Sequence, residues 1–111
     1  MSVIELRVMP HQTQRGLNYQ HLNFQFTTPD NLIEPSDLKG LEIPKQIDWK
    51  QGVVIEGKGP LWLYGYLTHE CHPAAWVGCY DTRRGAVVVS THTREVSVGQ
   101  VLELDLPAEI L

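Results

Sequence analysis

The sequence predicts an α+β fold, a two-layer sandwich in which one mixed β-sheet packs against one long helix and one short helix. Alternating apolar and polar residues mark most of the strands, and one long apolar segment after a proline marks the long helix. A length of 111 residues fits a single domain over residues 1–111.

The first half of the chain is expected to supply two strands and the short helix. Residues 4–8 and 21–26 alternate apolar and polar side chains, as half-buried strands do. The segment 27–50 contains three prolines and is expected to be mostly loop, with a short helix over residues 36–41.

The long helix is expected over residues 61–71, after a strand at residues 52–55. That strand is an unbroken apolar run, which is typical of burial on both faces. Pro60 suits the first turn of a helix, because its missing N–H costs nothing there. His72 precedes a proline, which pushes it out of helical geometry and ends the helix.

Three further strands are expected at residues 75–80, 86–91 and 102–106. The turn between the first two runs from Asp81 to Gly85, and such turns favour Asp and Gly at these places. Only the short second helix is left for one face of the sheet. We therefore expect a partner subunit to bury part of that face, as in a homo-oligomer.

Composition excludes several classes of protein. The net charge of −4 does not suit a protein that binds DNA or other long nucleic acid by its backbone. No apolar run approaches the ~20 residues that cross a bilayer, and no secretory signal is visible. Two cysteines are too few for a disulfide framework, so we expect a reduced, cytoplasmic protein with no membrane partner.

Histidines form the first candidate site. His69 and His72 are three residues apart on one helical face, where they could hold a metal or simply favour the helix dipole. Folding the hairpin about residues 82–84 brings His92 opposite Ala74, beside His72. The three histidines are therefore expected to converge at one end of the sheet.

Two other segments have two possible interpretations: each could bind a ligand, or each could simply form a turn. In the turn after residue 80, Asp81 could bind a hard cation and Arg83 could clamp a phosphate, although the turn itself explains the aspartate. The glycines of Gly57–Gly59 would let the backbone approach an anion before the long helix, or merely allow a tight turn.

Strand length separates the candidate residues. The six residues of the strand 75–80, at ~3.3 Å each, keep His72 and Asp81 roughly 20 Å apart. They cannot share a metal ion or a phosphate within one subunit. If both act in one reaction, the site must form between subunits.

The second half of the chain resembles the small CRISPR-associated ring nucleases, first described as manganese-dependent RNA deadenylases of type III CRISPR systems. The resemblance rests on GVVIEGKGPLWL at residues 52–63, HECH at 69–72 and YDTRRGAVVV at 80–89, together with His92. Pro73 stands where some relatives carry a second histidine.

The resemblance implies a ferredoxin-like subunit that forms a homodimer, with dimers sandwiching the ligand into a tetramer or filament. It implies cleavage of cyclic tetra-adenylate to linear adenylates, which switches off the CRISPR effector nucleases. It assigns catalytic roles to His72, Asp81 and Arg83.

The expected cofactor is Mn²⁺, held by Asp81 and by His72 unless His72 instead acts as the base. Arg83 would bind the non-bridging phosphate oxygens. The ligand-binding residues expected beside them are Lys58, Gly59, Arg84 and His92.

Three alternatives remain open at this point. The same site could trim 3′ adenosines from linear RNA, because the bond is the same. The protein could bind cyclic oligoadenylate as a sensor or sponge with little turnover. It could also be a structural oligomer whose histidines bind stray metal.

Overall fold

A computed structural model of the protein describes residues 3–104. The elements in chain order are β1 (Ile4–Gln12), β2 (Asn18–Phe26), the 3₁₀ helix η1 (Pro35–Leu38), β3 (Gly52–Glu56), α1 (Leu61–Glu70), β4 (Trp76–Asp81), β5 (Gly85–Thr91) and β6 (Val101–Leu102).

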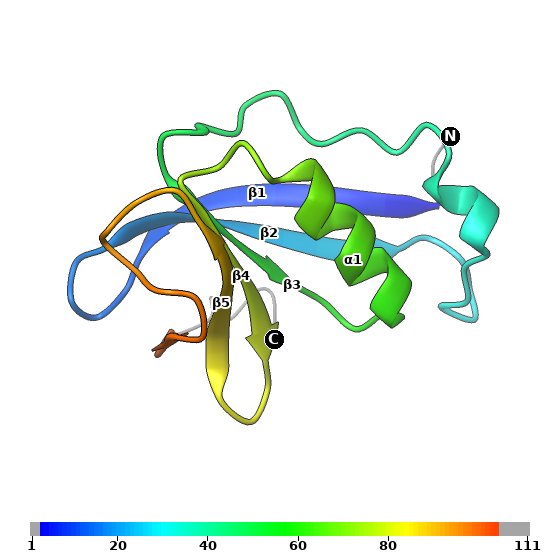
Figure 1. The fold of residues 1–111 in the computed structure, drawn as a ribbon. Coiled ribbons are helices and arrows are strands. Elements are labelled where there is room, and N and C mark those ends of the chain that lie inside the picture. The colour runs from blue at the N-terminus through cyan, green and yellow to red at the C-terminus, as the bar shows by residue number, and fades with distance from the viewer. Residues whose placement is uncertain (1–2, 105–111) are drawn as a thin grey trace.

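The six strands form one mixed sheet whose strand order follows the chain from β1 to β6 (Figure 1). The pairs β1–β2, β4–β5 and β5–β6 are antiparallel, whereas β2–β3 and β3–β4 are parallel. Each parallel pair needs a crossover, which the loop containing η1 supplies in the first case and α1 in the second. The expected α+β sandwich, with helix packed on a mixed sheet, is confirmed, and its two layers are consistent with a ferredoxin-like arrangement.

The main core lies between α1 and one face of the sheet. Leu63 and Leu67 of α1 are fully buried, against Val53 and Ile55 of β3. The long loop before β3 joins the same core through Leu41, so η1 and its loop extend the α1 layer. The short second helix therefore does not cover the opposite face.

The opposite face is covered in part by the chain that follows β5. Val54, Trp76 and Val88 form a second buried cluster with Val96 and Leu102. The chain itself thus buries this part of the face, and burial of another part by a partner subunit stays a prediction. Val53, Val54 and Ile55 are all fully buried, which confirms a central strand buried on both sides.

The strand and helix bounds differ from expectation mainly at the ends. β1 and β2 are longer than predicted, because their hairpin stays paired as far as Gln12 and Asn18. The short helix is a single 3₁₀ turn, started by the Asp37 carboxylate, which accepts a hydrogen bond from the Glu34 N–H at 2.7 Å. The last strand was expected over residues 102–106 but covers only Val101–Leu102 in the structure, and residues 105–106 lie outside the described residues.

One sheet edge is formed by β1. Pro10 pairs with Gln20 in the β1–β2 ladder, and Glu5 and Arg7 are exposed on the same strand. Pro10 has no backbone N–H, so its position inside β1 suits an edge strand, where the missing donor breaks no ladder hydrogen bond.

The long helix matches its prediction within one residue. It begins after Pro60 and ends at Glu70, and Leu61 at its start is 89% exposed. No helix within residues 3–104 is long and apolar enough to cross a membrane.

Candidate functional site: polar groups at the two ends of β4 and a cleft beside β3

A bulge in the β4–β5 hairpin decides where His92 lies. The pairs from Asp81↔Gly85 to Gly78↔Val88 follow the expected register, but Val77 pairs with Ser90 and Trp76 with Thr91. Val89 is thus the extra residue, and the register moves by one. His92 consequently lies opposite Ala75, whose carbonyl accepts its backbone N–H at 2.8 Å, rather than opposite Ala74.

His72 and His92 lie together at the end of the sheet where β4 begins. Their ring centroids are 4.9 Å apart and their planes are nearly perpendicular. His92 Nε2 donates a hydrogen bond to the His72 carbonyl oxygen at 3.1 Å, which fixes the proton on that nitrogen. Both side chains are exposed, so a ligand can reach the pair.

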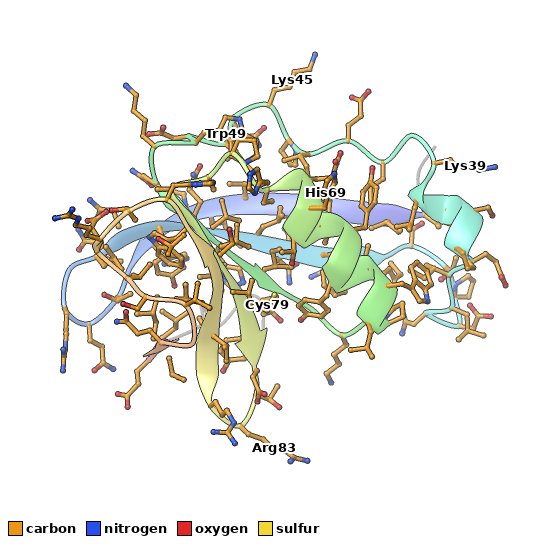
Figure 2. All side chains as sticks on the ribbon, viewed as in Figure 1. Lys39, Lys45, Trp49, His69, Cys79 and Arg83 are labelled. Atoms are coloured by element: carbon orange, nitrogen blue, oxygen red, sulfur yellow. The ribbon has the colours of Figure 1, made fainter. Side chains whose placement is uncertain are left out.

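His69 does not join this pair in a metal-binding cluster. It is exposed on the last turn of α1 (Figure 2). Within residues 3–104, no three His, Cys, Asp or Glu side chains lie close enough together to hold a metal ion. The expected convergence of three histidines therefore reduces to His72 and His92.

Asp81 and the arginines occupy the other end of β4. Asp81 Oδ1 accepts the Arg83 N–H at 2.7 Å, so the aspartate does stabilise the turn as its sequence position suggests. Arg83 and Arg84 are exposed, and in the described part of the chain neither forms an ion pair. Figure 2 shows Arg83 at the tip of the β4–β5 hairpin.

The two groups do not meet within one chain. His72 precedes β4, whereas Asp81 is its last residue, so the strand separates them along its whole length. The hydrogen bonds of each group are made with its own end of the hairpin. Within the described residues, His72 and His92 lie at one end of β4, and Asp81 and Arg83 lie at the other.

The loop between β3 and α1 packs tightly against β2. A Cβ at Gly57 would lie 2.7 Å from the Phe24 carbonyl oxygen, and one at Gly59 would lie 2.6 Å from the Phe24 ring. The Tyr64 hydroxyl donates to the Gly57 carbonyl at 2.7 Å and accepts the Gly57 N–H at 3.1 Å. Both glycines and Tyr64 therefore fix the loop from which Lys58 projects.

Lys58 lines an open cleft at the carboxyl ends of the parallel strands β2 and β3. Such strand ends are frequent ligand sites in sheets with parallel strands. The volume is about 580 Å³, within the ~300–1,000 Å³ range of small-molecule sites. Its lining residues are Asn23, Phe24, Gln25, Phe26, Asn31, Glu56, Gly57 and Lys58.

A buried polar cluster borders this cleft, and the sequence analysis did not find it. Glu56 Oε1 accepts His21 Nε2 at 2.9 Å and Asn23 Nδ2 at 2.8 Å. His21 is 0% and Asn23 2% exposed. Burial raises the pKa of Glu56, but the hydrogen bonds from His21 and Asn23 outweigh it and hold the pKa below 4.5. Glu56 is therefore an anion at neutral pH.

The cluster leaves two buried polar atoms unsatisfied. His21 Nδ1 and Asn23 Oδ1 have no hydrogen-bond partner among residues 3–104. Each such atom costs about 1–3 kcal/mol. Alternation in β2 had suggested that His21 and Asn23 face solvent. Only the register of β2 against β3, which brings Asn23 opposite Glu56, reveals the cluster.

The described residues form a small α+β protein with polar side chains at opposite ends of one sheet. The sequence was also compared with known protein families. The sequence model of the CRISPR-associated protein family Cas_csx3 matches residues 26–103, which is more than half of the chain. The chain belongs to this family.

A relative from Aquifex aeolicus (strain VF5) is similar to the chain. It is 42% identical over 75 residues, which cover 64% of this chain and 68% of the relative. That relative is described as an uncharacterized protein, so the comparison adds no function.

Proposed function

We propose that this protein is a ring nuclease, a phosphodiesterase that opens cyclic tetra-adenylate to linear adenylates and so switches off type III CRISPR effectors. Membership of the CRISPR-associated family supports the setting. The observation that carries the proposal is the separation of His72 and His92 from Asp81 and Arg83 at opposite ends of β4.

Two half-sites of this kind suit a ligand held between copies of the chain. The His72 end of one copy would face the Asp81 end of another, which is a head-to-tail contact that repeats into rings or filaments. A homodimer whose neighbours sandwich the ring satisfies this geometry. A cyclic tetranucleotide carries only a few phosphates, so local cations such as Arg83, Arg84 and Lys58 suffice despite the net charge of −4.

The reaction that these residues support is attack by a ribose 2′-oxygen on the adjacent phosphorus. His72 would accept the 2′-hydroxyl proton as the new O–P bond forms and the bond to the 5′-oxygen breaks. The leaving 5′-oxygen takes up a proton from water. Arg83 would bind the non-bridging oxygens and stabilise the charge that develops on them.

Mn²⁺ is the cofactor that the proposal includes. The carboxylate of Asp81 is a suitable donor type for Mn²⁺, and the imidazole of His72 would be a second ligand if it does not act as the base. Since residues 3–104 of one chain contain no three-ligand cluster, ligands from two copies would have to combine. A bound metal would polarise the phosphate or activate water.

The first experiment is incubation of the purified protein with cyclic tetra-adenylate, with Mn²⁺ and with a chelator, followed by chromatography. Manganese-dependent conversion to linear adenylates is expected. Tight binding without conversion would instead indicate a sensor or sponge. Activity only on linear RNA ending in adenosines would indicate a deadenylase, and no binding or conversion of either would overturn the proposal.

The shared site is tested by mixing two inactive variants. His72→Ala and Asp81→Asn should each lose most activity, while an equal mixture should regain about a quarter, because one contact in four then pairs two intact ends. The matched control mixes Asp81→Asn with Arg83→Ala, which damage the same end and should stay inactive. A first mixture as inactive as its components would refute a site shared between copies.

A cytoplasmic location belongs to the same proposal. The two cysteines in the chain, Cys71 and Cys79, are both free thiols, as a reducing compartment would keep them.

A further inference from the structure

Glu56 offers a fixed hydrogen-bond acceptor to the cleft beside β3. Its Oε1 atom is occupied by His21 and Asn23, both of which are buried. No described residue donates a hydrogen bond to Oε2, and this atom is not among the buried unsatisfied ones. Since Glu56 lines the cleft, Oε2 is the carboxylate atom that a ligand can reach.

The rest of the cleft adds a cation and an aromatic surface. Lys58 is exposed on the loop that Tyr64 fixes to Gly57, and it lines the same cleft. Phe26 is half-buried there, and its ring centroid is 5.7 Å from that of Phe24. An acceptor, a cation and an aromatic ring together suit a ligand with an amino group, a phosphate and a flat base.

We propose that this cleft binds a nucleotide whose base carries an exocyclic amino group, with Glu56 Oε2 accepting the amino N–H and Lys58 facing the phosphate. Glu56 then determines specificity, because a carboxylate oxygen rejects a base that presents a carbonyl at that place. His21 and Asn23 are positioning residues, which hold Oε1 and so aim Oε2.

This assignment rests on the proposed function for the choice of adenylate as the probe. Beyond that function, it identifies Glu56 Oε2 as the atom that would distinguish adenine from a 6-oxo base. It also explains why a buried histidine and a buried asparagine of β2 both donate to the half-buried carboxylate of Glu56 on β3, where apolar side chains would pack without unsatisfied atoms.

The decisive variant is Glu56→Gln. Its amide oxygen should take the place of Oε1 and accept from His21 and Asn23, which turns the amide NH₂ toward the cleft. The cleft then presents a donor in place of an acceptor at one point, with its shape unchanged. Specificity should therefore invert from an amino base to an oxo base.

The measurement is an NMR titration with 5′-adenylate and 5′-inosinate, which differ at this group. The unmodified protein should bind adenylate about tenfold tighter than inosinate, with shifts at the amides of Asn23, Gln25 and Lys58. Glu56→Gln should lose or reverse this ratio. Equal binding of both nucleotides, no binding in the cleft, or an unchanged ratio in Glu56→Gln would overturn the inference.

Two controls separate charge and phosphate contributions. Glu95→Gln removes the same charge from an exposed position outside the cleft and should leave the ratio unchanged. Lys58→Ala should abolish the advantage of adenylate over adenosine but keep the preference for adenosine over inosine. A Lys58→Ala variant that still favours adenylate over adenosine would remove Lys58 from the site.

Failure of this inference is distinguishable from failure of the proposed function. Cleavage of cyclic tetra-adenylate without any discrimination between adenylate and inosinate would leave the ring nuclease and overturn the amino-base site. Discrimination without cleavage would leave the site and overturn the nuclease.

Discussion

The geometry of the turn after β4 depends on a single residue, Gly85, where only glycine fits. It closes the turn that carries Asp81 and Arg83, at φ 112°. A Cβ there would lie 2.6 Å from the Leu102 carbonyl oxygen of β6. Both backbone conformation and space therefore require glycine at this position.

Gly85→Ala should lower the free energy of unfolding by about 2–4 kcal/mol, because it combines a strained φ with a backbone clash. Gly16→Ala is the matched control, since Gly16 has φ 85° and, apart from Gly16 itself and its two chain neighbours, no atom of residues 3–104 lies within 4 Å of its Cβ position. That variant should cost only about 1 kcal/mol. Urea denaturation measures both, and equal losses would show that the contact with β6 is unimportant.

The contribution of the Glu56 carboxylate to the free energy of unfolding should depend on pH. Because its pKa is lower in the folded protein than the ordinary 4.5, the anion stabilises the fold fully above that pH. The contribution is lost as the pH falls through the folded pKa. The stability advantage of the unmodified protein over Glu56→Gln should therefore shrink as the pH falls below 4.5. An advantage that grows on acidification in urea denaturation would contradict it.

At the scale of elements, Tyr64 joins α1 to the loop before it. Its hydroxyl satisfies both backbone polar groups of Gly57, and burial raises the pKa of Tyr64 to about 12, so it remains a donor. Loss of the hydroxyl would leave a part-buried N–H and carbonyl without partners.

Tyr64→Phe should reduce the free energy of unfolding by about 1–3 kcal/mol and speed hydrogen exchange at Gly57 and Lys58. Tyr66→Phe is its control, since the Tyr66 hydroxyl satisfies one backbone group, the Leu41 carbonyl at 3.0 Å. It should cost about 0.5–1.5 kcal/mol without affecting exchange at Gly57. Protection of Gly57 that survives in Tyr64→Phe would show that Phe24 packing alone holds the loop.

Local sequence patterns predicted most strands and the long helix, because the conformation of each depends mainly on the residues within it. The alternation in residues 4–8 and 21–26 and the apolar run at 52–55 place three strands, and Pro60 marks the start of α1. The 3₁₀ turn of η1 was harder to predict, because a side-chain contact of Asp37 rather than periodicity begins it.

Pairing between distant strands could not be predicted in the same way. The shift of His92 by one position depends on the bulge at Val89, which no local pattern marks. The Glu56 cluster needs the register of β2 against β3, whose ends are joined by a long loop. The proximity of His72 and His92 could be predicted, because the short turn at residues 82–84 limits the error in the β4–β5 pairing register to one residue.

At the scale of the whole molecule, the proposed ligand should drive assembly. Asp81→Asn is expected to bind cyclic tetra-adenylate without cleaving it, so its sedimentation coefficient should rise when the ring is added, as copies close on it from both sides. The same variant with linear adenylate is the control and should change less. A sedimentation coefficient unaffected by the ring would contradict binding between copies.

Pro10 and the charged residues near it on β1 limit the ways in which several copies of the chain can assemble. An outer strand with free backbone groups tends to recruit another chain and prolong the sheet. Here the missing N–H of Pro10 interrupts the row of donors, and the exposed charges of Glu5 and Arg7 flank it. Lateral growth through β1 is therefore disfavoured. Polymers of this protein should stack along the strand direction, with their strands running parallel to the fibre rather than across it as in amyloid.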